Sequence, residues 1–348
     1  MARQKKGNNS NEEDSNNENI SEKDLKIQQA MAAMRKQFGR NDVIQTLRDE
    51  AGSGENVFNV KFNSTGVLSV DKALGGGFPE GRIIELYGAQ SSGKTLLALT
   101  FIAEMQKRGH IAAFIDVEHA FDPSWARKNG VDTDSLLFAQ PDSGEEALEV
   151  MEALIRTGYV SVVVLDSVAA LVTKKELEGD MGDAHVGQQA RLMGQAMRKL
   201  TAAISKSHTT AIFINQIREK VGVTYGPTTT TSGGRALPFF ASQRVELAKI
   251  ESIKMSSTNE EIGSVIKARV VKNKVSPPFK IAQYDIRFDI GIDKVGNLIE
   301  LGSSAGLVEK SGAWFSYEGK KAQGLDKMRD LLTGEPELLE KLKSKLME

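Results

Sequence analysis

The sequence predicts an α/β fold: a mostly parallel, twisted sheet with helices on both faces. Four short, almost continuously apolar stretches are typical of buried parallel strands, namely residues 83–87, 110–118, 159–167 and 209–216. Between them, apolar residues recur at helical spacing over residues 96–108, 144–156 and 188–205. Strands and helices that alternate in this way build a sheet covered on both sides. A phosphate-binding motif between the first strand and the first helix supports the same fold.

Composition limits the classes of protein to which the chain can belong. With 348 residues, 40% of them hydrophobic, it can form one large α/β domain with small appendages. It has no Cys, which excludes disulfides and thiolate metal sites. Because its formal net charge is only −1, any contact with DNA must come from a local basic patch. The N-terminus lacks a signal-peptide core and no apolar run is long enough to span a bilayer, so we expect a cytoplasmic protein with no membrane partner.

Two parts are expected before the main fold. Residues 1–20 are rich in Asn, Glu and Ser and predict a disordered tail. Residues 21–62 predict an arm, because Ile27, Met31 and Phe38 fall on one face of a helix and residues 57–62 alternate as a strand. The helix could pack on its own domain or dock on a neighbouring subunit, and the sequence leaves both open.

The main fold is expected to be a core over residues 63–291, followed by a small α+β domain over residues 292–348. From Arg244 onward the apolar pattern changes, and three stretches predict antiparallel strands that extend the sheet: 244–250, 265–271 and 282–290. The C-terminal domain should end in a short amphipathic helix over residues 335–346.

The phosphate-binding motif is the most specific feature of the chain. Residues 88–95 read GAQSSGKT, which matches G-x-x-x-x-G-K-[ST] with a strand before it and a helix after it. Gly88 and Gly93 allow the backbone to approach phosphate, and the helix N-terminus attracts the anion. Lys94 can reach the β- and γ-phosphates, and the Thr95 hydroxyl can hold Mg²⁺. We therefore predict a nucleotide-binding loop that consists of Gly88, Ala89, Gln90, Ser91, Ser92, Gly93, Lys94 and Thr95.

Polar side chains end three of the predicted strands, at the edge of the sheet where ligands bind in such folds. Asp166 follows the apolar run VVVL and is expected to hold Mg²⁺, directly or through water; the alternative is a cap for the next helix. Glu118 could polarise an attacking water, or it could be an ordinary surface acid. The Gln216 amide could bond a γ-phosphate and report its presence to the residues that follow.

Two Gly-rich loops after strand ends are candidates for binding a polymer. In residues 217–234, Arg218, Lys220 and Tyr225 could contact phosphate or stack on a base. Residues 178–187 precede the helix that carries Arg191 and Arg198. Long loops in a compact domain are usually functional or disordered, so each loop could instead be a mobile lid and each Arg a solvated surface residue.

The order of these motifs resembles the bacterial RecA recombinase family. The resemblance extends almost without gaps over residues 64–279 and includes the segments LSVDKALGGGFPEGRIIELYGAQSSGKT, AFIDVEHAFDPSWARKNGVD, VVVLDSVAALVTKKELEGDMGDAH, GQQARLMGQAMRKL, IFINQIREKVGV and RVVKNKVSPPFK. It implies a RecA-like P-loop ATPase core that binds ATP with Mg²⁺ between the protomers of a helical filament on single-stranded DNA. Such a filament pairs that strand with homologous double-stranded DNA, exchanges strands, and promotes self-cleavage of a LexA-type repressor in the SOS response.

The resemblance also implies roles for single residues. Glu118 matches the catalytic glutamate, Asp166 the Walker-B aspartate and Gln216 the γ-phosphate sensor. Lys272 and Lys274 match lysines that reach the ATP of the neighbouring protomer and stabilise charge on the transferring phosphoryl group. The ATP site also includes Asp122 and Trp125, where Trp125 replaces a usual adenine-stacking tyrosine. Positions that contact DNA or signal from the loops are matched by Arg191, Arg198, Arg218, Lys220, Gly233 and Gly234, and Tyr225 lies in the same loop.

Some positions depart from the family pattern. Pro238 replaces an expected lysine beside the interface residue Phe239, which puts that contact in doubt. Val186 and Arg235 replace a usual Met and Asn near DNA, and the long acidic C-terminal tail is missing. Two alternative functions stay open: a nucleotide-switched DNA scaffold with little turnover, and a hexameric helicase-type motor. Glu118 argues against the scaffold, and the Lys272–Lys274 pair against the motor.

Overall fold

The computed structural model describes residues 22–40, 44, 60–180, 187–219, 229–255 and 258–347. The chain forms two compact units, residues 1–59 and residues 60–348. The first unit contains the predicted N-terminal helix, α1 (Glu22–Phe38), in which Met31 is buried. Residues 1–20 and residues 57–59 of the expected arm strand lie outside the described part of the chain. Among the described residues, no helix combines the length and the apolar character needed to cross a membrane.

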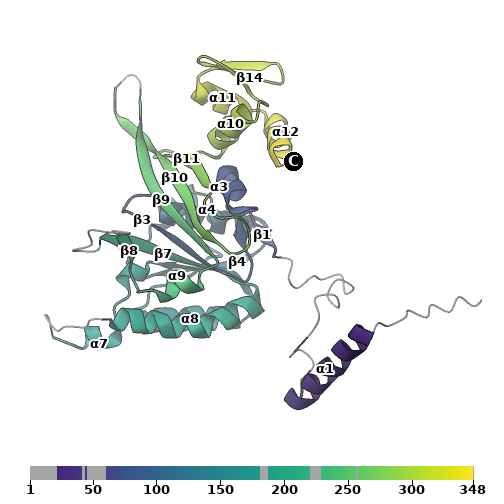
Figure 1. Cartoon of the computed structure of the whole chain (residues 1–348). Helices are drawn as coiled ribbons and strands as arrows, with labels where there is room; N and C mark the ends of the chain where they lie inside the picture. The colour runs from purple at the N-terminus through teal and green to yellow at the C-terminus, as the bar shows by residue number, and fades with distance from the viewer. Residues whose placement is uncertain are drawn as a thin grey trace, which may run out of the picture. The chain divides into compact units, whose positions relative to one another are not determined.

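The second unit is built on a ten-stranded sheet among the described residues, in the order β12-β11-β10-β9-β3-β7-β6-β4-β5 with β8 paired to β7 (Figure 1). The parallel pairs join β3 (Ile83–Gly88), β4 (Ile111–Asp116), β5 (Leu137–Ala139), β6 (Val160–Asp166), β7 (Thr210–Glu219) and β9 (Gln243–Lys254). The antiparallel extension adds β10 (Glu261–Asn273), β11 (Ile281–Arg287) and β12 (Gly291–Ile292). The predicted sheet and its antiparallel extension are confirmed.

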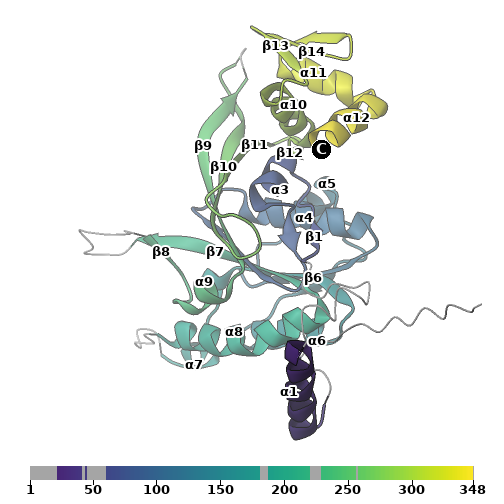
Figure 2. The same cartoon turned by 45° about the vertical axis from the view of Figure 1, so that its right-hand side comes forward.

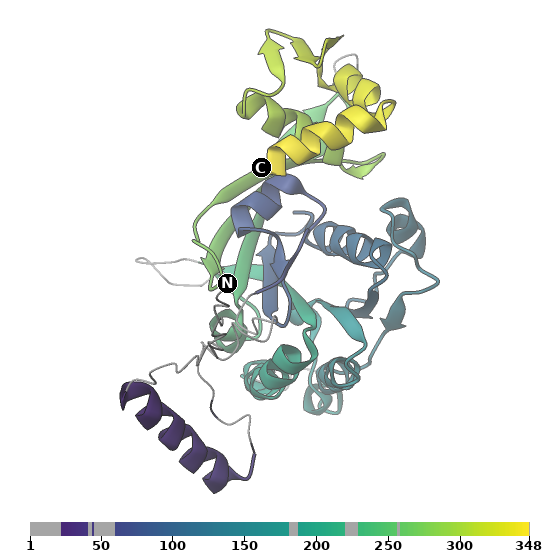
Figure 3. The same cartoon turned by 90° about the vertical axis from the view of Figure 1, so that its right-hand side faces the viewer.

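Helices cover both faces of this sheet because neighbouring strand residues point to opposite sides. In β6, Val162 and Val164 belong to one apolar cluster, whereas Val163 and Leu165 belong to the other. The first cluster is completed by α3 (Leu68–Leu74) and α4 (Lys94–Lys107), and the second by α6 (Gly144–Arg156) and α8 (Gln188–Ser207). Figures 2 and 3 show these two layers on opposite sides of the strands. The helices predicted over residues 96–108, 144–156 and 188–205 are confirmed.

Two predicted segments differ in the structure. Residues 60 and 61 are not in a strand, and the strand that follows is only β1 (Phe62–Asn63), paired with β2 (Phe78–Pro79). Part of the expected loop over residues 217–234 is instead β-strand. β7 continues to Glu219 and pairs antiparallel with β8 (Thr229–Thr231). The Thr run explains the second difference, since β-branched residues favour a strand once a partner strand lies beside them. Lys220 and Tyr225 of this segment lie outside the described residues.

Four short helical segments were not predicted from the sequence. They are α5 (Pro123–Lys128), the 3₁₀ turn η2 (Val168–Ala170), α7 (Lys174–Leu177) and α9 (Ala236–Phe240). None of them has more than six residues, which is too few to reveal a helical period. They matter because α5, η2 and α9 all lie at ends of the strands that carry candidate functional residues.

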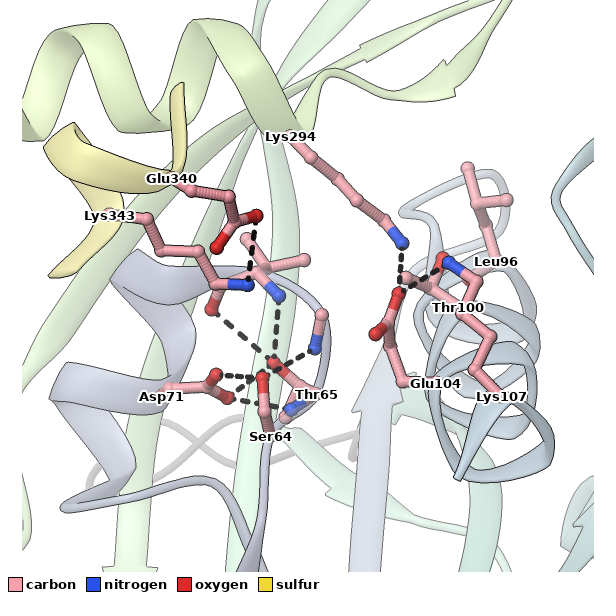
Figure 4. A network of polar contacts seen from close by, with 12 residues as sticks. Ser64, Thr65, Asp71, Leu96, Thr100, Glu104, Lys107, Lys294, Glu340 and Lys343 are labelled. Carbon is pink, nitrogen blue, oxygen red and sulfur yellow. Dashed lines mark hydrogen bonds and ion pairs between the residues drawn. The ribbon is translucent and has the colours of Figure 1, made fainter. Parts of the chain in front are cut away.

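The C-terminal part has an apolar cluster of its own. Its elements are α10 (Lys294–Ser304), β13 (Glu309–Ser311), β14 (Trp314–Tyr317), β15 (Lys320–Gln323), α11 (Leu325–Thr333) and α12 (Pro336–Met347). It contacts the sheet layer through ion pairs: Lys294 Nζ lies 2.7 Å from Glu104 Oε1 of α4, as Figure 4 shows, and Arg287 Nη1 of β11 lies 2.9 Å from Asp326 Oδ1. The predicted small α+β part with a final amphipathic helix is confirmed.

Candidate active site

The phosphate-binding motif lies between β3 and α4, as its sequence predicts. β3 ends at Gly88. Gly93, whose φ is +83°, directly precedes the first residue of α4. A Cβ at Gly88 would lie 2.1 Å from the Leu247 carbonyl oxygen of β9, and one at Gly93 would lie 2.5 Å from Ile286 Cδ1 of β11. The two glycines therefore let the loop pack directly against the neighbouring strands of the sheet.

The polar groups of this loop fit a phosphate. Ser92 Oγ is buried and has no hydrogen-bond partner among the described residues. Lys94 Nζ donates to the Ala89 carbonyl oxygen at 2.7 Å. Burial lowers the pKa of the Lys94 ammonium, while the charges of Asp166 and Glu118 act in the opposite direction. A buried hydroxyl, a buried cation and a helix N-terminus are the groups that phosphate oxygens satisfy.

Thr95 and Asp166 meet across 71 residues of sequence, where Thr95 Oγ1 donates to Asp166 Oδ2 at 2.6 Å. Burial is the main cause that raises the pKa of Asp166 to about 6; the carboxylates of Glu118 and Asp116 act in the same direction, and Thr95 and Lys94 in the opposite one. A divalent cation would stabilise the charge that burial disfavours. Among the described residues, no group of three or more acidic or His side chains is arranged to hold a metal. Mg²⁺ at this pair would therefore need phosphate oxygens and water to complete its shell.

Glu118 is exposed, yet its carboxylate is held by two side chains from neighbouring strand ends. Ser167 Oγ donates to Glu118 Oε1 at 2.5 Å, and Gln216 Nε2 donates to the same oxygen at 3.1 Å. Since β4, β6 and β7 are parallel neighbours, their carboxyl ends lie at one edge of the sheet. The structure thus brings Glu118, Asp166 and Gln216 together beside the phosphate loop, as the sequence predicts.

Two sets of contacts at this edge of the sheet were not predicted from the sequence. Ser167, which is fully buried, was given no role although it follows Asp166 directly. Glu85 is fully buried in β3, where its carboxylate accepts from Asn215 Nδ2 (3.0 Å) and pairs with Arg244. The run IIELYG contained the signal, because a Glu inside an apolar strand requires a buried partner. Asn215 Nδ2 also donates to the Ser232 carbonyl oxygen at 3.0 Å, just after β8.

Trp125, predicted to contact ATP, belongs to α5, and Asp122, predicted to contact it too, directly precedes that helix. Asp122 caps this helix, with Oδ1 accepting from Ser124 N (2.8 Å) and Trp125 N (3.2 Å). The Trp125 ring packs against the apolar cluster beneath α4, and Lys128 Nζ lies 5.4 Å from its centroid. Both residues therefore have structural contacts, and their part in nucleotide binding stays a prediction.

Lys272 and Lys274 lie at the end of β10, beside α9. Lys272 Nζ donates to the carbonyl oxygens of Pro238 (2.7 Å) and Phe239 (2.8 Å), and Lys274 Nζ to that of Phe239 (3.4 Å). Burial and the neighbouring cations Lys274 and Arg244 lower the pKa of Lys272 to about 8. Phe239 is 72% exposed. Lys272 bonds the backbone carbonyl of Pro238 within the chain; the loss of the interface contact expected from Pro238 stays a prediction.

The predicted DNA-contacting residues are only partly described. Arg191 and Arg198 are exposed on α8, and Arg218 is exposed on β7. Gly233 and Gly234 follow β8 in a turn with φ +80° and +76°. Lys220, Tyr225 and Val186 lie outside the described residues. Arg191 lies in the first turn of α8, whereas Arg198 lies near the middle of that helix.

Comparisons with known proteins agree with this geometry. The family model described as "RecA N-terminal domain" matches residues 25–293, and the "RecA C-terminal domain" model matches residues 296–348. Similar curated proteins named "Protein RecA" come from Desulforapulum autotrophicum, 50% identical over 94% of this chain and 93% of its own, and from Heliobacterium modesticaldum, 52% identical over 91% and 90%. A solved structure, "Crystal structure of the RadB recombinase", superposes with a TM-score of 0.50 at 21% identity, over 66% of this chain and 97% of that one. The last likeness concerns the fold alone.

Proposed function

The chain belongs to the RecA family, and from this membership we infer that it is a DNA-dependent ATPase that acts as a recombinase. Its filament forms on single-stranded DNA, pairs that strand with homologous double-stranded DNA and exchanges strands in recombinational repair. We assign ATP binding to the core, residues 63–291, and treat residues 292–348 as the small C-terminal domain. Cytoplasmic location and action on a LexA-type repressor are further parts of this proposal.

The observation that carries the ATPase proposal is the shared contact on Glu118 Oε1. Ser167 and Gln216 both donate to this oxygen, so they hold the carboxylate in one orientation and leave Oε2 to accept a proton from water. The loop from Gly88 to Thr95 would hold the triphosphate, and Thr95 with Asp166 would hold Mg²⁺, which supplies charge stabilisation at the phosphate when bound. Glu118 then serves as the general base.

Gln216 can signal the state of the nucleotide. Its side-chain amide has two N–H donors, and one of them is bonded to Glu118. A γ-phosphate within reach would compete for these donors, so the position of Gln216 depends on whether the phosphate is present. Gln216 lies in β7, which leads directly into the hairpin with β8. ATP hydrolysis at the phosphate loop is therefore connected to the β7–β8 hairpin, which we propose binds DNA.

Lys272 and Lys274 are proposed to complete the site of the neighbouring protomer. Their ammonium groups lie beside α9, where Phe239 is exposed. An exposed aromatic ring suits a contact with another protein, and two cations beside it suit a partner surface that carries negative charge. At such a contact the lysines would stabilise negative charge on the phosphoryl group.

Electron microscopy of the protein with single-stranded DNA and a slowly hydrolysed ATP analogue tests the proposed function. We expect helical filaments on the DNA. Closed rings would refute the filament and favour a helicase-type motor. Filaments combined with no measurable ATP hydrolysis would favour the scaffold. Single-stranded DNA affinity should also fall steeply as salt rises, because contacts with phosphates release counterions; a flat response would contradict the assignment of Arg191, Arg198 and Arg218.

A further inference from the structure

Gln189, in the first turn of α8, contacts two other segments with one side chain. Its Nε2 donates to the carbonyl oxygens of Val168 (2.8 Å) and Leu171 (3.1 Å), and its Oε1 accepts from Gly233 N (3.1 Å). A carboxamide has two N–H donors and one carbonyl oxygen, so each polar atom of this side chain is bonded to backbone. Together with α8 itself, three segments meet at Gln189.

Each of these segments adjoins a part of the proposed machinery. Val168 and Leu171 belong to the turn that follows Asp166 and Ser167, and Ser167 Oγ donates to Glu118. α8 begins immediately after Gly187, the last residue of the first candidate DNA loop. Gly233 follows β8, at the end of the second. In Figures 1 and 2 the β7–β8 hairpin lies over the end of α8 that is nearest to α7.

The packing around Gly233 leaves little room for independent movement. A Cβ at Gly233 would lie 2.8 Å from Val168 Cγ1, and one at Gly234 would lie 2.7 Å from the Ala190 Cβ of α8. Ser232, the residue before Gly233, is also held, because Asn215 Nδ2 donates to its carbonyl oxygen. Asn215 is adjacent to Gln216. A displacement of this turn therefore acts on Val168 and on Gln189 together.

We propose that Gln189 is a positioning residue that couples DNA at the hairpin to the orientation of Glu118, an inference that rests on the proposed function. The connection runs from Gly233 through Gln189 to the turn after Asp166, and from Ser167 to the carboxylate. Coupling between two ligands is reciprocal, so the same side chain also transmits the nucleotide state to the DNA-binding segment.

Two substitutions of Gln189 test the coupling. Gln189→Glu keeps the shape but places a carboxylate oxygen against the carbonyls of Val168 and Leu171, and Gln189→Met keeps the length but removes all three bonds. Gln195→Glu and Gln195→Met are the matched controls, because Gln195 is exposed on the same helix. The measurement is the Kd of a slowly hydrolysed ATP analogue, with and without a single-stranded oligonucleotide.

The ratio of these two Kd values isolates coupling from stability. Allosteric couplings are typically about 5- to 150-fold; we expect such a ratio in the native protein and in the Gln195 variants. In both Gln189 variants the ratio should fall below about 2, while the Kd without DNA stays within about threefold of native. A folded Gln189 variant that keeps the native ratio would overturn the inference, and so would a loss of affinity without DNA that leaves the ratio unchanged.

The native protein separates this inference from the proposed function. If DNA changes neither nucleotide affinity nor hydrolysis in the native protein, the proposed function fails. If the native protein shows both effects and the Gln189 variants keep them, only the coupling role fails. Should both variants unfold, hydrogen exchange of the native protein decides the matter: the ATP analogue alone should slow exchange in residues 229–234, and an unchanged rate would refute the coupling.

Discussion

At the scale of single residues, the candidate site concentrates ionisable groups where water is scarce. Burial raises the pKa of Asp166 and lowers that of Lys94, so each charged form is disfavoured by its surroundings. Their opposite charges offset only part of this cost. The site is therefore electrostatically incomplete by itself, as expected for a place where phosphate and a divalent cation bind together.

Glu118→Gln should stop hydrolysis while nucleotide binding persists. The amide keeps the size of the side chain and an oxygen to accept from Ser167 and Gln216, but it cannot take a proton from water. General-base catalysis typically contributes about 10²–10⁴-fold, so single-turnover hydrolysis should slow by about that factor with little change in nucleotide Kd. Glu149→Gln, on an exposed position of α6, is the control. Normal hydrolysis by Glu118→Gln would remove Glu118 from the mechanism.

Asp166→Asn should stabilise the metal-free, nucleotide-free protein at neutral pH. The native pKa of about 6 lies above the ordinary value of 3.8, so between pH 4 and 6 the native state holds a proton that the unfolded state has lost. Its free energy of unfolding therefore falls as pH rises through that window, by about 3 kcal/mol as an upper estimate. The free energy of unfolding of Asp166→Asn does not fall in this way, because asparagine does not ionise.

Thermal unfolding in EDTA at several pH values checks the Asp166 prediction. The melting temperature of Asp166→Asn should exceed that of the native protein at pH 8 and approach it at pH 4. The exposed Asp142→Asn should follow the native curve at both values. A variant that is less stable than the native protein at pH 8 would show that the ionised carboxylate is not disfavoured in the fold.

Single-residue contacts were predictable only where a motif names the chemistry. Lys94 and Thr95 lie in a motif, and Asp166 at the end of an apolar strand, so their type and position pointed to phosphate and metal. Ser167 carries no such signal, since a serine after a strand is common and its partner Glu118 is 49 residues away. The pairing of Glu85 with Asn215, 130 residues apart, likewise depends on strand order rather than on sequence spacing.

At the scale of elements, long periodic segments were predictable and short ones were not. The helix over residues 144–156 was predicted with the bounds that the structure has, because its apolar stripe is clear. In the structure Ser143 caps it. β8 and α9 are too short for a period, and tertiary pairing decides them. The pairing of β7 with β8 thus replaces part of the loop predicted over residues 217–234. It places residues 217–219 beside residues 229–231.

Gly93→Ala should damage the phosphate loop more than strain alone explains. An alanine with φ near +80° costs about 1–2 kcal/mol at any position, and at Gly93 the added Cβ would also lie 2.5 Å from Ile286 Cδ1. Gly109 is the matched control, with φ +80° and nothing within 4 Å of an added Cβ. We expect both variants to lose thermal stability, but only Gly93→Ala to lose nucleotide affinity, by at least about tenfold. Equal behaviour of the two would show that the contact with β11 does not shape the loop.

At the scale of the whole molecule, the proposed active site is divided between two surfaces. The phosphate loop, Glu118 and Gln216 lie at the carboxyl ends of the parallel strands, whereas Lys272 and Lys274 lie beside α9 at the end of β10. Two different patches that meet head to tail form a heterologous interface, which repeats as an open helix unless the rotation closes. That the site is shared between protomers rests on the family resemblance and stays a prediction, because one chain's residue pattern contains no information about its neighbour.

Mixing two inactive variants tests whether the site is shared. Lys94→Ala retains both lysines of the proposed trans pair, and a chain with Lys272→Ala and Lys274→Ala retains the phosphate loop. In filaments formed from equal amounts of the two, roughly a quarter of the joints combine an intact loop with an intact pair. We expect DNA-dependent ATP turnover near that fraction of the native rate, although each variant alone is inactive.

The control mixes Lys94→Ala with Glu118→Gln, whose defects fall on the same side of every joint. Each chain then lacks a residue that must act within one protomer, so no pairing of chains can assemble a complete site. This mixture should stay inactive even when it forms filaments on DNA. If the lysines instead act within their own chain, the first mixture will be as inactive as the control, because neither of its chains holds a complete set. Recovery in the first mixture but not in the second thus requires that adjacent protomers share the ATP site.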